Sequence, residues 1–282
     1  MTADRTSDGT DPGGHGLAGV VLAAGFGTRL RPLSRLRPKA LCPVGGVPLL
    51  DRALANLSPL AGAGPQHLAV NAHALAEQVV AHVGGRAHLS VEQPEALGTA
   101  GALGRLRGWL DGRDVLLANA DAYLDGDLSV LTQGVDGQGW DGERCRLLTV
   151  PTGGRGDFDG RRYVGACLLP WRLVRELTEE PSGLYEVMWR AEHEAGRLEL
   201  VDFAGTAVDC GTPADYLRAN LHASGGASVV GLGAVVEGTL ERCVVWDGAY
   251  VAPGEHLVEC VRAGTREEPL TVSASLAGSR PA

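Results

Sequence analysis

A buried strand followed directly by a glycine turn constrains this chain more than any other feature of its sequence. Residues Val20 to Ala24 form a continuous apolar run, which is typical of a parallel strand buried on both faces of a sheet. Gly25 and Gly27 follow at once, and because they lack Cβ atoms, successive backbone N–H groups can converge on an anion. The segment therefore predicts a phosphate-binding turn at the carboxyl end of a buried strand.

Two cations, Arg29 and Lys39, follow the turn, while Pro32 and Pro38 disfavour one continuous helix between them. We therefore expect a loop that wraps around a ligand, and glycines followed by cations suit a triphosphate. Lys39 is the only lysine among the 25 Lys and Arg residues. This favours a need for a compact ammonium at that position, although chance in a lysine-poor chain explains it about equally well.

Strand and helix patterns alternate along the next part of the chain. Apolar runs at residues 67–71 and 87–91 predict strands, and helical periodicity begins at Pro48 and again at residues 75–83. Such βαβ alternation implies a parallel sheet that binds ligands at the carboxyl ends of its strands. We therefore predict an α/β fold, with a Rossmann-like domain and a mostly parallel central sheet, over residues 17–222.

The rest of this domain is expected to continue the pattern. Residues 133–144 are rich in Gly and Asp and should form a surface loop. The later apolar runs predict strands at residues 146–150, 163–169 and 198–203 and helices at residues 170–178 and 184–195.

A loop that runs from Glu92 into a predicted helix carries a candidate base-binding site. Gln93 offers both a donor and an acceptor, as reading the edge of a nucleobase requires, and Gly98 would let the backbone approach the base closely. An ordinary loop with a proline turn gives the same pattern. We favour the base-binding interpretation because of the sequence context given below.

Two buried strands are predicted to end in a carboxylate. Residues 115–121 predict a strand that ends at Asp121, and residues 207–217 predict a strand that ends at Asp209, then a glycine turn and a helix capped by Thr212. A carboxylate at the same sheet edge as a phosphate loop suits a hard cation that neutralises a triphosphate. Aspartates at strand ends are also common turn formers, so the pattern alone leaves both interpretations open.

Several motifs together resemble one enzyme family. The run Leu-Ala-Ala-Gly-Phe-Gly-Thr-Arg-Leu-Arg-Pro-Leu, followed by Pro-Lys, at residues 22–39 resembles the signature of the sugar-1-phosphate nucleotidyltransferases, and it lacks the Gly-x-Gly-x-x-Gly and Gly-Lys-Ser/Thr patterns. Further resemblances are Gly-Thr-Ala-Gly-Ala-Leu at residues 98–103, Asn-Ala-Asp at residues 119–121 and Asp-Cys-Gly-Thr-Pro-Ala-Asp-Tyr at residues 209–216. The chain looks most similar to the N-acetylmuramic acid-1-phosphate uridylyltransferase and mannose-1-phosphate guanylyltransferase branch.

The resemblance implies roles for individual residues. The catalytic residues would be Arg29, Lys39, Asp121 and Asp209, and the two aspartates would bind Mg²⁺. The nucleotide-binding residues would be Leu22, Ala23, Ala24, Gly25, Gly27, Thr28, Gln93, Gly98 and Thr99. The sugar-binding residues would be Asn119, Asp157, Gly165 and Glu186. Glu186 fits equally well as a first-turn glutamate that complements the helix dipole.

The sugar side departs from much of the family. Where many members have a Val-x-Glu-Lys-Pro tract for the sugar phosphate, this chain has Thr149 and Val150. The run Gly-Asp-Phe at residues 156–158 instead resembles the uridylyltransferase branch. A cation for the sugar phosphate could come from one of three nearby arginines, Arg155, Arg161 and Arg162.

The pattern changes after residue 227. Val and Leu recur there at intervals of about five to seven residues, which resembles a degenerate hexapeptide repeat. We expect short, left-handed β-helix-like coils over residues 223–265, and coils of this kind would allow a homo-oligomer to form through them. Residues 1–16 are expected to be a disordered tail and residues 266–282 a second tail, because neither shows apolar periodicity.

The composition of the chain argues against several classes of binding partner. The net charge of −9 argues against nucleic acid or an anionic membrane as a partner. No apolar run reaches the roughly 18 residues of a membrane span, and residues 1–16 lack the basic and apolar regions of a signal peptide. The six cysteines show no Cys-x-x-Cys spacing, so we expect reduced, mostly buried thiols in a cytoplasmic protein and no metal clamp.

The resemblance to the sugar-1-phosphate nucleotidyltransferases implies a Mg²⁺-dependent enzyme that makes an NDP-sugar and pyrophosphate from an NTP and a sugar 1-phosphate, by in-line attack on the α-phosphorus. One alternative is a catalytically silent regulatory homologue that binds NDP-sugar, which the missing Glu-Lys pair motivates. A second is a cytidylyltransferase that acts on an alcohol phosphate, against which the Asp-Cys-Gly-Thr-Pro segment speaks. Gln93 suits uracil, thymine or guanine, so neither the base nor the sugar is predicted.

Overall fold

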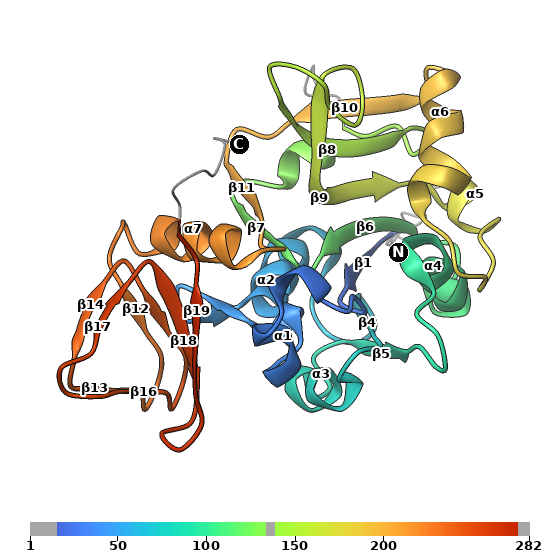
Figure 1. Cartoon of the computed structure of the whole chain (residues 1–282). Coiled ribbons are helices and arrows are strands. Elements are labelled where there is room, and N and C mark those ends of the chain that lie inside the picture. The colour runs from blue at the N-terminus through green and yellow to red at the C-terminus, as the bar shows by residue number, and fades with distance from the viewer. Residues whose placement is uncertain (1–15, 134–138, 276–282) are drawn as a thin grey trace, which may run out of the picture.

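A seven-stranded sheet forms the centre of the computed structural model, which describes residues 16–133 and 139–275 (Figure 1). The strand order is β10-β8-β9-β6-β1-β4-β5. Every neighbouring pair is parallel except those of β9, which is antiparallel to both β6 and β8. The predicted α/β fold with a mostly parallel sheet is therefore confirmed. The strands are β1 (Leu17–Leu22), β4 (Leu68–Ala72), β5 (His88–Val91), β6 (Asp114–Asn119), β8 (Cys145–Pro151), β9 (Arg161–Leu169) and β10 (Leu198–Asp202).

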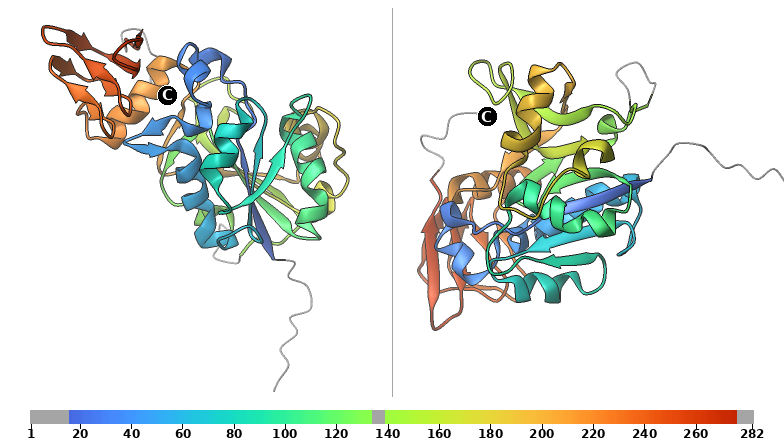
Figure 2. Two further views of the ribbon diagram at one scale, coloured as in Figure 1. Left: turned by 90° about the horizontal axis from the view of Figure 1, so that it is seen from below. Right: turned by 90° about the vertical axis from the view of Figure 1, so that its right-hand side faces the viewer.

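Helices cover both faces of this sheet (Figure 2). On one face, α2 (Leu49–Ala61) and α3 (Ala76–Val83) pack with Val21 in one hydrophobic cluster. On the other face, α4 (Gly98–Leu110), α5 (Trp171–Val174) and the π-helix η4 (Tyr185–Trp189) pack with Val20 in a second cluster, and α6 (Arg190–Glu194) continues from η4. Successive residues of β1 thus enter different cores, which explains why its sequence is continuously apolar.

Short elements surround the carboxyl ends of these strands. As the prolines predict, the segment after the glycine turn contains only η1 (Thr28–Leu30), α1 (Leu33–Leu36) and η2 (Lys39–Leu41). The hairpin of β2 (Pro43–Val44) and β3 (Val47–Pro48) follows, and η3 (Ser129–Leu131) lies after β7 (Ala122–Asp125). β7 pairs antiparallel with β11 (Thr206–Asp209), and α7 (Pro213–Ala223) begins with the predicted cap, because the Thr212 hydroxyl accepts the Asp215 N–H.

Two predicted helices differ from the structure. The helix expected at 170–178 ends at Val174, and the helix expected at 184–195 begins as the π-helix η4. A stripe of glycines on α4 provides the reason, because the backbone after α5 packs directly against it. A Cβ atom on Gly98, Gly101 or Gly104 would lie 2.5, 2.5 and 2.0 Å from the carbonyl oxygens of Ser182, Glu180 and Thr178, respectively. This close packing of backbone against a helix overrides the local helical periodicity of residues 175–178.

Other boundaries differ by a few residues. β1 ends at Leu22 and not at Ala24, because the Ala23 N–H donates to the Asn71 side chain and leaves the strand ladder. α2 begins at Leu49, and Pro48 belongs to β3. The second tail, expected from residue 266, contains β19 (Pro269–Ser273), which pairs with β18 (Cys260–Gly264). The first tail, residues 1–16, lies outside the described residues except for Gly16.

The C-terminal strands form three small sheets, in which every neighbouring pair is parallel except β18 and β19. The first three of these strands along the chain are β12 (Val229–Val230), β13 (Val235–Val236) and β14 (Thr239–Glu241). They pair in parallel with β15 (Val244–Val245), β16 (Tyr250–Val251) and β17 (His256–Val258), respectively. Paired residues in these strands therefore lie about 15 positions apart in the sequence. That the strands form a left-handed β-helix stays a prediction.

These strands lie at one end of the molecule, beside α7 (Figures 1 and 2). Trp246 is buried there, and its Nε1 donates to the Tyr216 hydroxyl at 3.1 Å. The Tyr216 hydroxyl in turn donates to the Pro43 carbonyl. Arg37 lies over the Trp246 ring at 4.8 Å and contacts the Asp247 carboxylate at 3.4 Å. The C-terminal strands are thus tied to both ends of the short segment that carries Lys39.

No helix in the described part of the chain is long and apolar enough to cross a membrane. All six cysteines, Cys42, Cys145, Cys167, Cys210, Cys243 and Cys260, are buried free thiols, as the sequence predicts.

Candidate functional site

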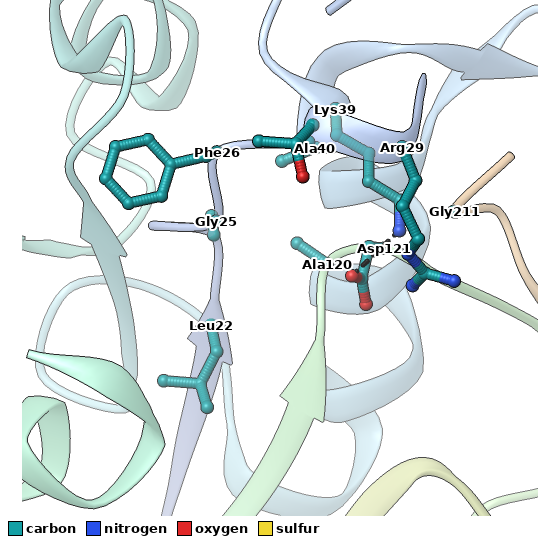
Figure 3. Close-up of a pocket in the computed structure, with 12 residues that line it drawn as sticks. Leu22, Gly25, Phe26, Arg29, Lys39, Ala40, Ala120, Asp121 and Gly211 are labelled. Carbon is teal, nitrogen blue, oxygen red and sulfur yellow. Dashed lines mark hydrogen bonds and ion pairs between the residues drawn. The ribbon is translucent and has the colours of Figure 1, made fainter. Parts of the chain in front are cut away.

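Two cations and two carboxylates meet at the carboxyl ends of the central strands, and Figure 3 shows three of these residues, Arg29, Lys39 and Asp121. The Lys39 Nζ lies 2.9 Å from Asp121 Oδ2 and 3.1 Å from Asp209 Oδ1. The Arg29 Nη2 lies 3.0 Å from Asp209 Oδ2. The four residues predicted to be catalytic therefore form one connected group of ion pairs, although they are far apart in the sequence.

The fold explains how the two aspartates come together. Asp121 lies in the turn between β6 and β7, and Asp209 ends β11, whose register places it opposite Ala122. The Cys210 N–H donates to the Asp121 carbonyl at 3.0 Å and closes this arrangement. Gly211 leaves room for Arg29, because a Cβ at this position would lie 2.6 Å from the guanidinium. Each carboxylate is thus fixed by backbone pairing.

Lys39 is far less accessible than its partners. Its side chain is 8% exposed, whereas those of Asp121 and Asp209 are 45% and 46% exposed. Burial alone would lower the pKa of Lys39, but the two carboxylates outweigh burial and raise that pKa above its ordinary value. The ammonium is therefore charged at neutral pH and is held in one position before any substrate arrives.

For Asp209, burial and the neighbouring charges shift the pKa in opposite directions, and the charges have the larger effect. Burial favours its neutral form, but the charges of Lys39 and Arg29 hold the pKa of Asp209 below its ordinary value. The ionised Asp209 carboxylate therefore adds to the free energy of unfolding at any pH above the pKa that Asp209 has in the unfolded chain. This contribution is lost as the pH falls through the lower pKa that Asp209 has in the folded protein. The ion pairs therefore persist throughout the neutral range.

Three hollows adjoin this group, and Asp121 lines all of them. We call them the turn hollow, about 280 Å³, the loop hollow, about 320 Å³, and the strand hollow, about 360 Å³. The turn hollow contains the glycine turn, Lys39 and Arg29. Together the hollows have the volume of a typical small-molecule site.

Most of the predicted nucleotide-binding residues line these hollows. Gly27 has a left-handed φ of +59° and its carbonyl accepts the Ser34 hydroxyl at 2.7 Å, which fixes the turn. Gln93 differs, because it is exposed and lines a separate open hollow with His73 and Pro94. The other predicted residues line the turn hollow or the loop hollow: Leu22, Ala23, Ala24, Gly25, Gly27, Thr28, Gly98 and Thr99.

The predicted sugar-binding residues divide in the same way. Asn119, Asp157 and Gly165 line the strand hollow, where Asp157 also accepts the Tyr163 N–H at 2.9 Å. Glu186 is exposed on η4 and lines none of the hollows described here. Its place near the start of this helix agrees with the alternative of a first-turn glutamate.

Sequence reasoning missed a buried polar network behind the site. Glu92 is fully buried and accepts hydrogen bonds from Asn71 Nδ2 and from the Leu97 N–H, both at 2.7 Å. The Asn71 oxygen accepts the Ala23 N–H at 2.6 Å. Two side chains therefore connect the glycine turn to the loop that precedes α4. The signal available in the sequence was Asn71 itself, a polar residue inside a run that is otherwise apolar.

We expect Glu92→Ala to destabilise the protein by about 2 to 4 kcal/mol, because it leaves two buried donors without partners. Chemical denaturation followed by circular dichroism measures this change. Glu95→Ala is the matched control, since Glu95 is exposed on the same loop and should change stability by less than about 0.5 kcal/mol. Equal effects of the two substitutions would contradict the structural role given to Glu92.

The carboxylates fit a divalent cation. Both contact the same nitrogen, and both are about half exposed toward the hollows. Mg²⁺ is commonly held by one or two carboxylates together with substrate phosphates and water. Within the described residues, no group of three or more His, Cys, Asp and Glu side chains is placed to hold a metal ion. Asp121 and Asp209 thus suit an ion whose remaining ligands come from phosphates.

Part of the chain is similar in sequence to known proteins. Residues 18–149 match the family model described as nucleotidyl transferase. The chain is 34% identical over 151 residues, 50% of its own length, to an N-acetylmuramate alpha-1-phosphate uridylyltransferase of Caulobacter vibrioides. It is 31% identical over 122 residues, 42% of its length, to a mannose-1-phosphate guanylyltransferase of Mycobacterium tuberculosis. The matches span 61% and 33% of these two relatives, so the chain covers less than two thirds of their length.

The fold is also similar to that of a solved structure. A protein from Thermus thermophilus described as mannose-1-phosphate geranyltransferase superposes with a TM-score of 0.65 and 22% identity. The match covers 92% of this chain and 95% of that one, so it extends into the C-terminal strands. At this level of identity, the similarity shows a shared fold.

Proposed function

We propose that this chain joins an NTP and a sugar 1-phosphate into an NDP-sugar and releases pyrophosphate. The chain matches the nucleotidyl transferase family model, and the comparisons confirm its resemblance to the sugar-1-phosphate nucleotidyltransferases. One observation supports this proposal most. A buried ammonium, Lys39, lies between two half-exposed carboxylates at the mouth of a glycine turn. This arrangement suits a reaction between two polyanions.

The proposed reaction needs positioning and charge neutralisation, and no protein nucleophile. An oxygen of the sugar phosphate attacks the α-phosphorus of the NTP, and the bond from that phosphorus to the leaving pyrophosphate breaks. The amides of Gly25 to Thr28 and the Arg29 guanidinium bind the β- and γ-phosphates, which fits their place around the turn hollow. Lys39 contacts the α-phosphate and the attacking phosphate.

Preorganisation is the contribution of the ion pairs. The carboxylates hold the Lys39 ammonium in place, so the protein does not have to reorient it as charge moves onto the leaving group. When bound by Asp121 and Asp209, Mg²⁺ would supply further neutralisation of the phosphate oxygens. In this proposal the nucleotide binds in the turn hollow and the sugar in the strand hollow beside β9, and Asp121 lines both.

A grid of substrates tests the proposal. UTP, GTP, dTTP, CTP and ATP are each combined with mannose 1-phosphate, glucose 1-phosphate and N-acetylmuramic acid 1-phosphate, and pyrophosphate release is measured. We expect one pair to exceed all others by at least about tenfold in kcat/KM, because a site that hydrogen-bonds its ligand discriminates strongly. An absence of pyrophosphate release for every pair, in the presence of Mg²⁺, would refute transferase activity.

Calorimetry with NDP-sugars tests the alternative that the chain is a catalytically silent regulatory homologue. Thr149 is one of the two residues at the place of the missing Glu-Lys pair, and it is buried and bonded to Arg161 and to the Val201 carbonyl. It therefore does not replace the missing glutamate. Tight binding of an NDP-sugar by a protein that shows no turnover would select the silent homologue.

A cytoplasmic location is part of the proposal, and the six free thiols support it. Contact between copies through residues 223–265 stays a prediction.

A further inference from the structure

We infer that Arg162 binds an anionic group of the sugar phosphate and thereby helps to select that substrate, an inference that rests on the proposed function. Arg162 lies near the start of β9, is half-buried and lines the strand hollow with Asp121 and Asp209. Within residues 16–133 and 139–275, its side chain has no hydrogen bond or ion pair. A cation that lines a cleft without a partner is an obvious site for an anionic ligand.

The two neighbouring arginines do not have this property. The Arg161 guanidinium is paired with Asp202 and donates to the Thr149 hydroxyl at 2.8 Å, and Arg161 does not line the strand hollow. Arg155 is exposed on the turn before β9 and lines none of the hollows described here. Of the three arginines that the sequence leaves open, the structure therefore favours Arg162.

The charges around the strand hollow also favour Arg162 as the residue that binds an anion. The positive charges of Lys39 and Arg29 face the carboxylates of Asp121 and Asp209. Asp157, also on this hollow, already accepts a backbone N–H. Among the described side chains that line the hollow, Arg162 is thus the cation whose charge no ion pair balances.

β9 brings Arg162 close to the reacting centre. Gly165, three residues further along, has a φ of +99°, and a Cβ there would lie 2.8 Å from the Ala122 side chain. The strand is therefore in direct contact with the turn that carries Asp121. Three residues of a strand span about 10 Å, a distance that one arginine side chain and one phosphate group together can bridge.

The anionic group can have two sources on such a substrate. One is the phosphate, which every sugar 1-phosphate carries, and the other is an acidic substituent on the sugar ring. Mannose 1-phosphate has only the first, and N-acetylmuramic acid 1-phosphate has both. Comparing these two ligands therefore separates the sources.

Three variants test the inference by isothermal calorimetry with each sugar phosphate, and by steady-state kinetics where there is turnover. We expect Arg162→Gln to weaken sugar-phosphate binding by about tenfold or more, because a hydrogen-bonded ion pair is lost, and to change the KM for the NTP less than twofold. Arg162→Lys should restore part of the affinity, since it keeps the charge but loses the planar fork. Arg155→Gln is the matched control and should bind like the wild type.

The outcomes are distinct. An equal loss with both sugar phosphates supports contact with the phosphate, and a loss confined to N-acetylmuramic acid 1-phosphate supports contact with the acidic substituent. If Arg162→Gln binds both ligands as Arg155→Gln does, the inference is wrong. A wild type that binds a sugar phosphate through Arg162 but never releases pyrophosphate would keep the inference and refute the proposed activity. Thermal unfolding of each variant confirms that it is folded, and Arg162→Lys serves if Arg162→Gln is not.

Discussion

Lys39→Ala is expected to lower kcat/KM for pyrophosphate release by about 10²- to 10³-fold, the usual loss when a preorganised charge partner of a transition state is removed. The effect should be large because Lys39 is the buried member of the ion-pair group and contacts both carboxylates. Activity should fall mainly through kcat, since Arg29 and the glycine turn still bind the nucleotide.

The protein should remain folded in this variant. Asp121 and Asp209 are about half exposed, so water can solvate them after the ammonium is removed. Thermal unfolding by circular dichroism provides that check. Lys39→Arg is the informative companion variant, because a planar guanidinium keeps the charge but cannot take the compact position between two carboxylates. Wild-type rates in Lys39→Ala would exclude the proposed mechanism.

The second large effect concerns the metal. Activity should require Mg²⁺, and removal of the metal by a chelator should abolish pyrophosphate release until Mg²⁺ is added back. Asp121→Asn and Asp209→Asn should each lower kcat by about 10²-fold at fixed Mg²⁺, because each removes one anionic ligand from the site. Titration of the rate with Mg²⁺ should show a higher half-saturating concentration in both variants.

Asp111→Asn is the matched control for these variants. Asp111 is exposed at the end of α4 with a φ of +45°, a conformation that asparagine also adopts readily. Its rate and Mg²⁺ dependence should equal those of the wild type. Near-normal turnover by Asp121→Ala with the metal chelated would count decisively against the role given to the two aspartates.

The position of the site was predictable because it follows from topology. Parallel strands bring their carboxyl ends to one edge, so the glycine turn after β1 and Asp121 after β6 had to lie near each other once both strands were recognised. Asp209 could be assigned from its resemblance to a known motif. Its physical cause, the antiparallel pairing of β11 with β7, is not visible in local periodicity.

Other features depend on contacts between distant segments, which local patterns do not contain. The three arginines at 155, 161 and 162 look alike in the sequence, and only their partners distinguish them. Glu92 reads as a loop residue until Asn71 and Leu97 are brought to it. The helix expected at 170–178 fails for the same reason, because the glycine stripe of α4 acts on it from outside.

The contacts of Trp246 and Asp247 connect the C-terminal strands to the segment that carries Lys39, on which the proposed reaction depends. Heat or a protease that loosens residues 229–273 would release Arg37 on one side and Pro43, through Tyr216, on the other. We expect the proposed turnover to decline when these strands loosen, because the segment that carries Lys39 then loses both contacts. A simple rate assay can therefore report the integrity of the far end of the molecule.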